Sequence, residues 1–253
     1  MERTPEKKVI LIITDISGYT RFMVSNRQTL LHGQFIISEL TKAIIAKVNI
    51  PLEISKLEGD AVFLYAMKEN GQSWLETSTQ IGKKLLDFLA AFADKLLELE
   101  QSNTCPCTAC MSMKNLNLKI VVHSGEALRY QIGKFEELSG VDVIIVHRLL
   151  KNSVPAREYI LMTEAAYRDV QFPVEVPVNP GEEIYDDIGK ISTFVFLPGA
   201  ASESVAPPDQ KRYSSWFYRW KNKHLKRWKS RLIDRGWIKL PKFNNLPEEA
   251  GKG

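Results

Sequence analysis

Lys8-Val-Ile-Leu-Ile-Ile-Thr-Asp15-Ile-Ser-Gly18 is the stretch from which the fold of this 253-residue chain is inferred. The apolar run at residues 9–13 is rich in β-branched side chains and predicts a short buried strand. The polar residues and the glycine that follow it predict a turn. A buried strand is therefore expected to end on the carboxylate of Asp15.

A second carboxylate is expected close to the first. Residues 52–54 and 61–66 are mainly apolar and flank the mainly polar stretch 55–60, a pattern that predicts a β-hairpin with Asp60 in its turn. If the hairpin and the first strand are neighbours in one sheet, Asp15 and Asp60 meet at the same edge of that sheet.

The rest of the first 199 residues alternates between helical and strand patterns. The expected elements are two helices within 19–48 that separate at Gly33, a helix at 73–99, strands at 116–123 and 127–132, a helix at 141–151, and strands at 159–162 and 191–197. This order mixes hairpins with crossovers. It predicts an α+β fold whose sheet is covered by helices mainly on one face.

Two carboxylates at one sheet edge are a ligand set for a hard divalent cation. Mg²⁺ prefers oxygen ligands and usually takes one or two carboxylates, with water and substrate phosphates completing its octahedron. The alternative is structural, because Asp15 can cap the following helix and Asp60 can shape a turn. Spacing alone leaves both interpretations open.

Four motifs, in order along residues 8–197, resemble the class III adenylyl and guanylyl cyclases, in an uncharacterised bacterial branch of that family. They are Ile13-Thr-Asp15-Ile-Ser-Gly18-Tyr19-Thr20, Lys56-Leu-Glu-Gly59-Asp60, Val121-Val-His123-Ser-Gly125-Glu126, and Gly-Val-Asp-Val-Ile-Ile-Val-His-Arg-Leu at 140–149. The resemblance implies a ferredoxin-like cyclase fold with a mixed, mostly antiparallel sheet. It also implies a homodimer that assembles its sites between two subunits.

The resemblance implies roles for individual residues. Asp15 and Asp60 would bind two Mg²⁺ or Mn²⁺ ions, with the backbone carbonyl of Ile16 as a further oxygen ligand. Lys56 and Glu137 would bind the purine base of a nucleoside triphosphate. ATP is expected rather than GTP because Lys56 can hydrogen-bond N1 of adenine, although Glu137 could equally accept the N1–H and amine of guanine.

The resemblance also implies a reaction, conversion of the triphosphate to a 3′,5′-cyclic nucleotide and pyrophosphate. Arg148 would stabilise charge on the phosphate in the transition state. This chain departs from the family pattern at Ile144, where the family has an orienting Asn, and at the triphosphate-binding Lys, which aligns with Ile188 or, with a shift, Lys190. The alternative is therefore a degenerate, nucleotide-sensing or interaction module.

Three cysteines, Cys105, Cys107 and Cys110, lie within six residues in a C-x-C-x-x-C pattern. Thiolates at this spacing are typical of Zn²⁺ sites, and a fourth ligand could be His123, a water or a residue of a second subunit. The alternative is three reduced surface thiols. We expect His123 to be a structural residue of its strand, and His32 and His147 to be packing residues.

Charge is segregated along the chain. The whole chain carries +4, but residues 210–242 contain 12 Lys or Arg and one acid and so carry +11, which leaves −7 on the remainder. No apolar run approaches the roughly 20 residues that span a bilayer. We therefore expect a cytoplasmic protein with a cyclase-like domain at 1–199, a linker at 200–209 and a basic, Trp-rich helical tail at 210–253.

The tail contains four of the five tryptophans, at 216, 220, 228 and 237. Drawn as a helix, it places aromatic and apolar residues on about half of its surface. This arrangement suits peripheral binding to an anionic membrane surface through residues 210–242. Docking on the acidic body or on a partner, and binding to nucleic acid, remain as alternatives.

Overall fold

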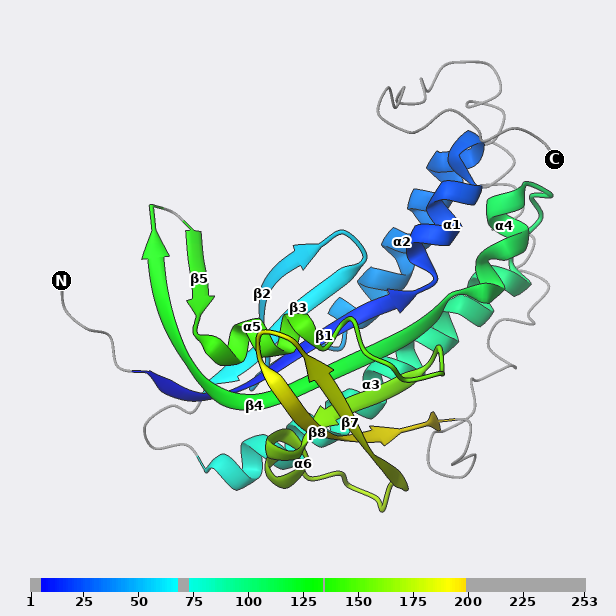
Figure 1. Cartoon of the computed structure of the whole chain (residues 1–253). Helices are drawn as coiled ribbons and strands as arrows, with labels where there is room; N and C mark the ends of the chain where they lie inside the picture. The colour runs from blue at the N-terminus through cyan, green and yellow to red at the C-terminus, as the bar shows by residue number, and fades with distance from the viewer. Residues whose placement is uncertain (1–5, 68–72, 134, 199–253) are drawn as a thin grey trace.

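The predicted buried strand is present as β1 (Lys7–Ser17), the third of seven strands in the order β2-β3-β1-β4-β6-β8-β7. The computed structural model describes residues 6–67, 73–133 and 135–198 (Figure 1). The other strands are β2 (Glu53–Glu58), β3 (Ala61–Met67), β4 (Asn117–Ile132), β5 (Phe135–Ser139), β6 (Tyr159–Thr163), β7 (Val178–Tyr185) and β8 (Gly189–Phe196). The helices are α1 (Tyr19–Ser25), α2 (Leu30–Ile45), α3 (Trp74–Gln101), α4 (Thr108–Ser112), α5 (Val141–Arg148) and α6 (Glu164–Asp169).

The sheet is mixed and mostly antiparallel. β4 and β6 are its parallel pair, and β5 pairs with the end of β4 to form a hairpin that projects from the sheet (Figure 1). β1 lies between β3 and β4 and is antiparallel to both. The predicted α+β class is confirmed.

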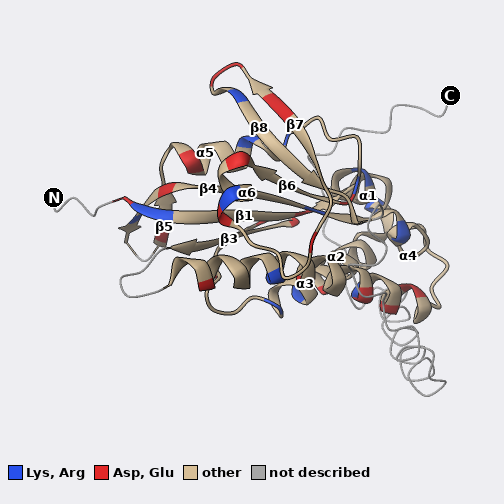
Figure 2. Ribbon diagram, turned by 90° about the horizontal axis from the view of Figure 1, so that it is seen from below, with Lys and Arg blue, Asp and Glu red and all other residues tan. Residues whose placement is uncertain are grey.

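The sheet packs against an apolar layer on each of its two faces. Alternate side chains of β1 point to opposite faces, so Ile10 and Ile12 pack with α2 and α3, whereas Val9 and Leu11 pack beneath α5. All four are fully buried, and burying such a side chain stabilises the fold by about 1.5–3 kcal/mol. Figure 2 shows α2 and α3 together on one side of the sheet and the short α5 on the other.

Four predicted element boundaries were wrong. β1 continues to Ser17, two residues beyond Asp15, where the strand was expected to end. The first helical segment breaks at the turn around Asn26, and Gly33 lies inside α2, buried beside Phe22 and Met23. Residues 55–58 were expected in the hairpin turn, but they belong to β2. The turn consists of Gly59 and Asp60. The two strands expected at 116–132 are one long strand, β4, whose hairpin partner is β5.

None of the helices in the described part of the chain combines the length and the hydropathy needed to span a bilayer. The predicted linker at 200–209 and basic tail at 210–253 lie outside the described residues, as does the boundary at 199.

Candidate functional site

The two predicted metal-binding carboxylates lie together. Asp15 is the ninth residue of β1, and Asp60 follows Gly59 in the turn between β2 and β3. Gly59 has a φ of +66° and Gly18 a φ of +88°, conformations that other residues rarely adopt, so both motif glycines are required by the turns they make. The turns bring the two carboxyl groups close enough that Asp15 raises the pKa of Asp60.

The electrostatics of this pair favour a cation. Burial, the charge of Asp15 and a hydrogen bond between the two carboxyl groups raise the pKa of Asp60 to about 7. Nζ of Lys119 lies 2.8 Å from Oδ2 of Asp15 and partly offsets the shift. Two half-buried carboxyl groups at one strand end fit the oxygen donor set of Mg²⁺ or Mn²⁺. Ile16 follows within β1 with its side chain in the core, so its carbonyl belongs to the same strand end.

The predicted base-binding residues also meet. Nζ of Lys56 on β2 lies 3.7 Å from Oε2 of Glu137 on β5 and 3.1 Å from Oε1 of Glu58. Burial alone would lower the pKa of Lys56, but the two glutamates outweigh it and the pKa is raised. Lys56 is thus a charged donor beside the carboxyl group of Glu137, an arrangement that offers both a donor and an acceptor of hydrogen bonds.

Arg148 ends α5 and borders a groove of about 320 Å³ lined by Val143, Ile144, His147, Arg148 and Lys151. Its guanidinium forms an ion pair with Asp187, which precedes β8. Ile144 is 54% exposed in this groove and presents no hydrogen-bonding group there. Lys190, the shifted candidate for a triphosphate ligand, is paired with Glu182 on the adjacent strand.

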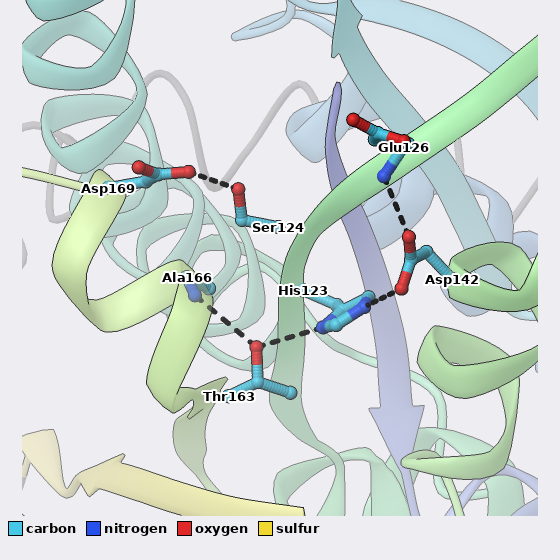
Figure 3. A network of polar contacts seen from close by, with 7 residues as sticks. All are labelled: His123, Ser124, Glu126, Asp142, Thr163, Ala166 and Asp169. Atoms are coloured by element: carbon cyan, nitrogen blue, oxygen red, sulfur yellow. Dashed lines mark hydrogen bonds and ion pairs between the residues drawn. The ribbon is translucent and has the colours of Figure 1, made fainter. Parts of the chain in front are cut away.

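His123 is a structural residue, as expected (Figure 3). Its Nε2 lies 2.8 Å from Oδ1 of Asp142 at the start of α5, and its Nδ1 lies 2.9 Å from Oγ1 of Thr163 at the end of β6. The other oxygen of Asp142 accepts a hydrogen bond from the backbone N–H of Glu126. A Cβ at Gly125 would lie 2.2 Å from the Asp142 carboxyl group, which explains the glycine of this motif. The network joins β4, α5 and β6, so His123 does not complete the cysteine cluster.

The residue that joins the cysteines is His32, which we had expected to be a packing residue. The ligand atoms of His32, Cys105, Cys107 and Cys110 all lie within 4.8 Å of one another. No sequence pattern points to His32, because it precedes the first cysteine by more than 70 residues and lies on a different helix.

Comparison with known proteins gives a family and a fold. A model of the family described as "Protein of unknown function (DUF2652)" matches residues 37–159. The "Uncharacterized protein Rv2561/Rv2562" of Mycobacterium tuberculosis is 32% identical over 158 residues, which cover 62% of this chain and 72% of that protein.

Solved structures of similar fold are cyclases. A bacterial light-regulated adenylyl cyclase aligns over 88% of this chain with a TM-score of 0.54 and 15% identity, and this chain spans 56% of its length. The dimeric guanylyl cyclase domain of the RhoGC fusion protein from the aquatic fungus Blastocladiella emersonii aligns over 77% of this chain and 98% of its own, with a TM-score of 0.52 and 16% identity. The guanylyl cyclase Cya2 covers 81% of this chain and 96% of its own, with a TM-score of 0.51 and 13% identity. The chain therefore belongs to the family of the mycobacterial protein Rv2561/Rv2562, and it has the fold of class III nucleotidyl cyclase domains.

Proposed function

We propose that this protein binds a purine nucleoside triphosphate with Mg²⁺ or Mn²⁺ and converts it to a 3′,5′-cyclic nucleotide and pyrophosphate as a homodimer. The observation that carries the proposal is the contact between Asp15 and Asp60, the pair that raises the pKa of Asp60 to about 7. Ionising both carboxyl groups lowers the stability of the metal-free protein, whereas a bound cation favours the ionised form of both.

The chain's own residues divide the work of the reaction. Asp15 and Asp60 would hold the ions, Lys56 and Glu137 would bind the base, and Arg148 would exchange Asp187 for oxygens of the α-phosphate. The ribose 3′-oxygen forms a bond to the α-phosphorus, the bond from that phosphorus to the bridging oxygen breaks, pyrophosphate leaves and the hydroxyl proton passes to water. The bound ions would supply charge neutralisation and a lowered pKa of the hydroxyl. The protein's part is positioning and electrostatic stabilisation.

Lys56 and Glu137 support a purine as the substrate, with ATP ahead of GTP. Lys56 can donate to N1 of adenine, which has no hydrogen of its own. Glu137, on β5, forms an ion pair with Lys56 and can accept a hydrogen bond from an amino group of the base.

A homodimer is supported by exposed apolar side chains on α5. Val141 and Ile144 are 69% and 54% exposed. Large apolar side chains that gather on one face of a soluble domain mark an interaction surface. A second copy of this chain would cover them and bring its own Arg148 groove towards the Asp15–Asp60 edge.

Mass-spectrometric analysis of products tests the reaction. The intact protein is incubated with ATP, GTP, CTP or UTP and Mn²⁺, and cyclic purine nucleotide plus an equal amount of pyrophosphate is expected. The Asp15→Asn/Asp60→Asn variant should make none, whereas Asp87→Asn, which removes an exposed carboxylate paired with Lys83 on α3, should match the wild type. Absence of cyclic product from all four nucleotides rejects the cyclase reaction.

Ile144 favours a second candidate, a module that binds nucleotide and signals without turnover. Its exposed side chain lies in the groove beside Arg148 and cannot orient a ribose or phosphate. A polar contact to the transition state contributes ~10²-fold or more in rate. Ile144→Asn should therefore raise cyclase activity by about that factor if the wild type is a slow enzyme. Nucleotide binding without product in both proteins supports the sensing module.

A further inference from the structure

A cluster of four soft and imidazole ligands lies away from the proposed nucleotide site, at the end of the molecule where α4 packs beside α1 and α2 (Figure 1). His32 comes from the first turn of α2, Cys105 and Cys107 from the loop after α3, and Cys110 from α4. All four side chains are half-buried. The ligands thus come from two segments that are far apart in the sequence.

The spacing of the ligand atoms is that of a tetrahedral zinc site. Nδ1 of His32 lies 3.2 Å from Sγ of Cys107, 3.5 Å from Sγ of Cys105 and 3.6 Å from Sγ of Cys110. With Zn–S bonds of about 2.3 Å and Zn–N bonds of about 2.0–2.1 Å, the N···S edge of a tetrahedron is about 3.6 Å. A hydrogen bond between His32 and a thiol would bring only one sulfur this close to Nδ1. Here Nδ1 is nearly equidistant from three sulfurs, as in a shared metal site.

The loop that carries the cysteines is held in this conformation by its own hydrogen bonds. Oδ1 of Asn103 accepts from the N–H of Cys105, and its Nδ2 donates to the carbonyl oxygens of Cys105 and Cys110. Sγ of Cys107 accepts from the N–H of Cys110 at 3.5 Å, as sulfur ligands commonly do. Such outer contacts orient metal ligands and raise metal affinity.

We propose that His32, Cys105, Cys107 and Cys110 bind one Zn²⁺ ion in a closed, structural Cys₃His site. Three thiolates and one imidazole match the ligand preference of Zn²⁺, and four protein ligands leave no position for a substrate or a reactive water. The His and Cys ligands cannot form the oxygen site of Mg²⁺, so this ion is distinct from those proposed at Asp15 and Asp60.

The ion would join α2 to the segment that leads into β4. Nδ2 of Asn26, in the turn before α2, donates to Oγ of Ser112 at the end of α4. The carbonyl oxygen of Asn115 lies 3.4 Å from where a Cβ of Gly18 would be, at the turn that follows Asp15. A zinc ion at the cluster would therefore hold in place the segment that packs against the turn at Gly18, which follows Asp15.

Metal analysis of the intact protein, purified without chelators, tests the proposal. We expect about one zinc per chain by elemental analysis. Replacing zinc with Co²⁺ should give the visible d–d bands of a tetrahedral thiolate complex. His32→Gln should lower zinc affinity by more than the roughly 10- to 100-fold that loss of an outer contact costs. His32→Cys, which supplies a fourth thiolate, should restore zinc binding.

Met111→Ser is the matched control, because Met111 adjoins Cys110 but its side chain is 62% exposed and belongs to no ligand set. This variant should retain zinc and the Co²⁺ spectrum. Less than a tenth of a zinc per chain in the wild type, three freely reacting thiols and no binding of added zinc would overturn the proposal. Equal zinc affinity in the wild type and His32→Gln would overturn the assignment of His32.

Discussion

Nζ of Lys119 lies 2.8 Å from Oδ2 of Asp15, its directly opposite neighbour in the antiparallel β1–β4 pair. This ammonium group also acts on Asp60, but it supplies one positive charge to two carboxylates. The metal-free site is therefore short of positive charge. The free energy of unfolding should therefore depend on pH, on bound metal ions and on whether both carboxylates are present.

Asp60→Asn should stabilise the metal-free protein at neutral and alkaline pH. The pKa of Asp60 is raised to about 7 from an ordinary value of 3.8, so the folded state binds its proton more tightly than the unfolded state does. The stability that this group provides is complete below about pH 4 and is lost as pH rises to about 7. Because Asp60 is partly exposed, we expect a gain of about 1–2 kcal/mol above pH 7 and none near pH 4.

Urea denaturation in the presence of a chelator, at several pH values, measures this difference. Added Mn²⁺ should reverse the order, because the wild type gains a bound ion and the variant loses a ligand. A pH-independent difference between the two proteins would show that the carboxyl pair does not interact as described.

Glu137→Thr should change the choice of purine. The carboxylate of Glu137, 3.7 Å from Lys56, can accept from the N1–H and the amine of guanine, but N1 of adenine carries no hydrogen. Its loss should weaken GTP binding more than ATP binding, by about 10-fold or more in the ratio of dissociation constants. Glu136→Gln is the control, because Glu136 pairs with Arg129 instead. An unchanged ratio in Glu137→Thr would remove Glu137 from the base pocket.

Val141→Glu should convert the dimer to a monomer while the fold stays intact. Val141 is 69% exposed at the start of α5, so a charge there is solvated in the monomer but would be buried in the proposed interface. Burying an unpaired carboxylate costs several kcal/mol, which corresponds to a dimer dissociation constant raised about 100-fold or more. Sedimentation measures this constant. Leu75→Glu, at a comparably exposed position on α3, should leave it unchanged, and undiminished dimerisation of Val141→Glu would reject this interface.

Truncation after Asp209 should abolish binding to anionic lipid vesicles. The 12 basic residues and four tryptophans of 210–242 lie outside the described residues, and their composition alone carries this prediction. Binding of the intact chain should weaken with salt, since the Debye length falls from about 10 Å at 0.1 M to about 3 Å at 1 M. Neutral vesicles are the control. Salt-dependent binding to RNA without vesicle binding would favour a nucleic-acid role, and aggregation of the truncated chain would assign the tryptophans to its core.

The parts of the fold that the sequence predicted are those with strong local signals. The β1 run at 9–13 is apolar without interruption, and the long α3 keeps its helical spacing throughout. β4 was divided in error because Ser124, Gly125 and Glu126 read as a turn, whereas these residues continue the strand and pair with β1. β7 was missed because its exposed residues include Pro180 and carry no apolar alternation.

The candidate site was predicted where family motifs supplied the residues. Lys119 was missed because its role comes from the β1–β4 register, and register is set by tertiary pairing. His32 was missed for a similar reason, since the packing of α2 against α4 brings it to the cysteines. Contacts between distant segments leave no local periodicity for a single sequence to show.

Calorimetric titration of ATP and GTP into the intact protein, with and without Mn²⁺, tests the central claim most directly. We expect both nucleotides to bind only with the metal ion, ATP more tightly, and we expect the Asp15→Asn/Asp60→Asn variant to lose this metal-dependent binding while remaining folded. Binding is required by the cyclase and by the sensing module alike. Absence of nucleotide binding to the folded wild-type protein at millimolar Mn²⁺ would contradict the account and leave the cyclase fold without a nucleotide site.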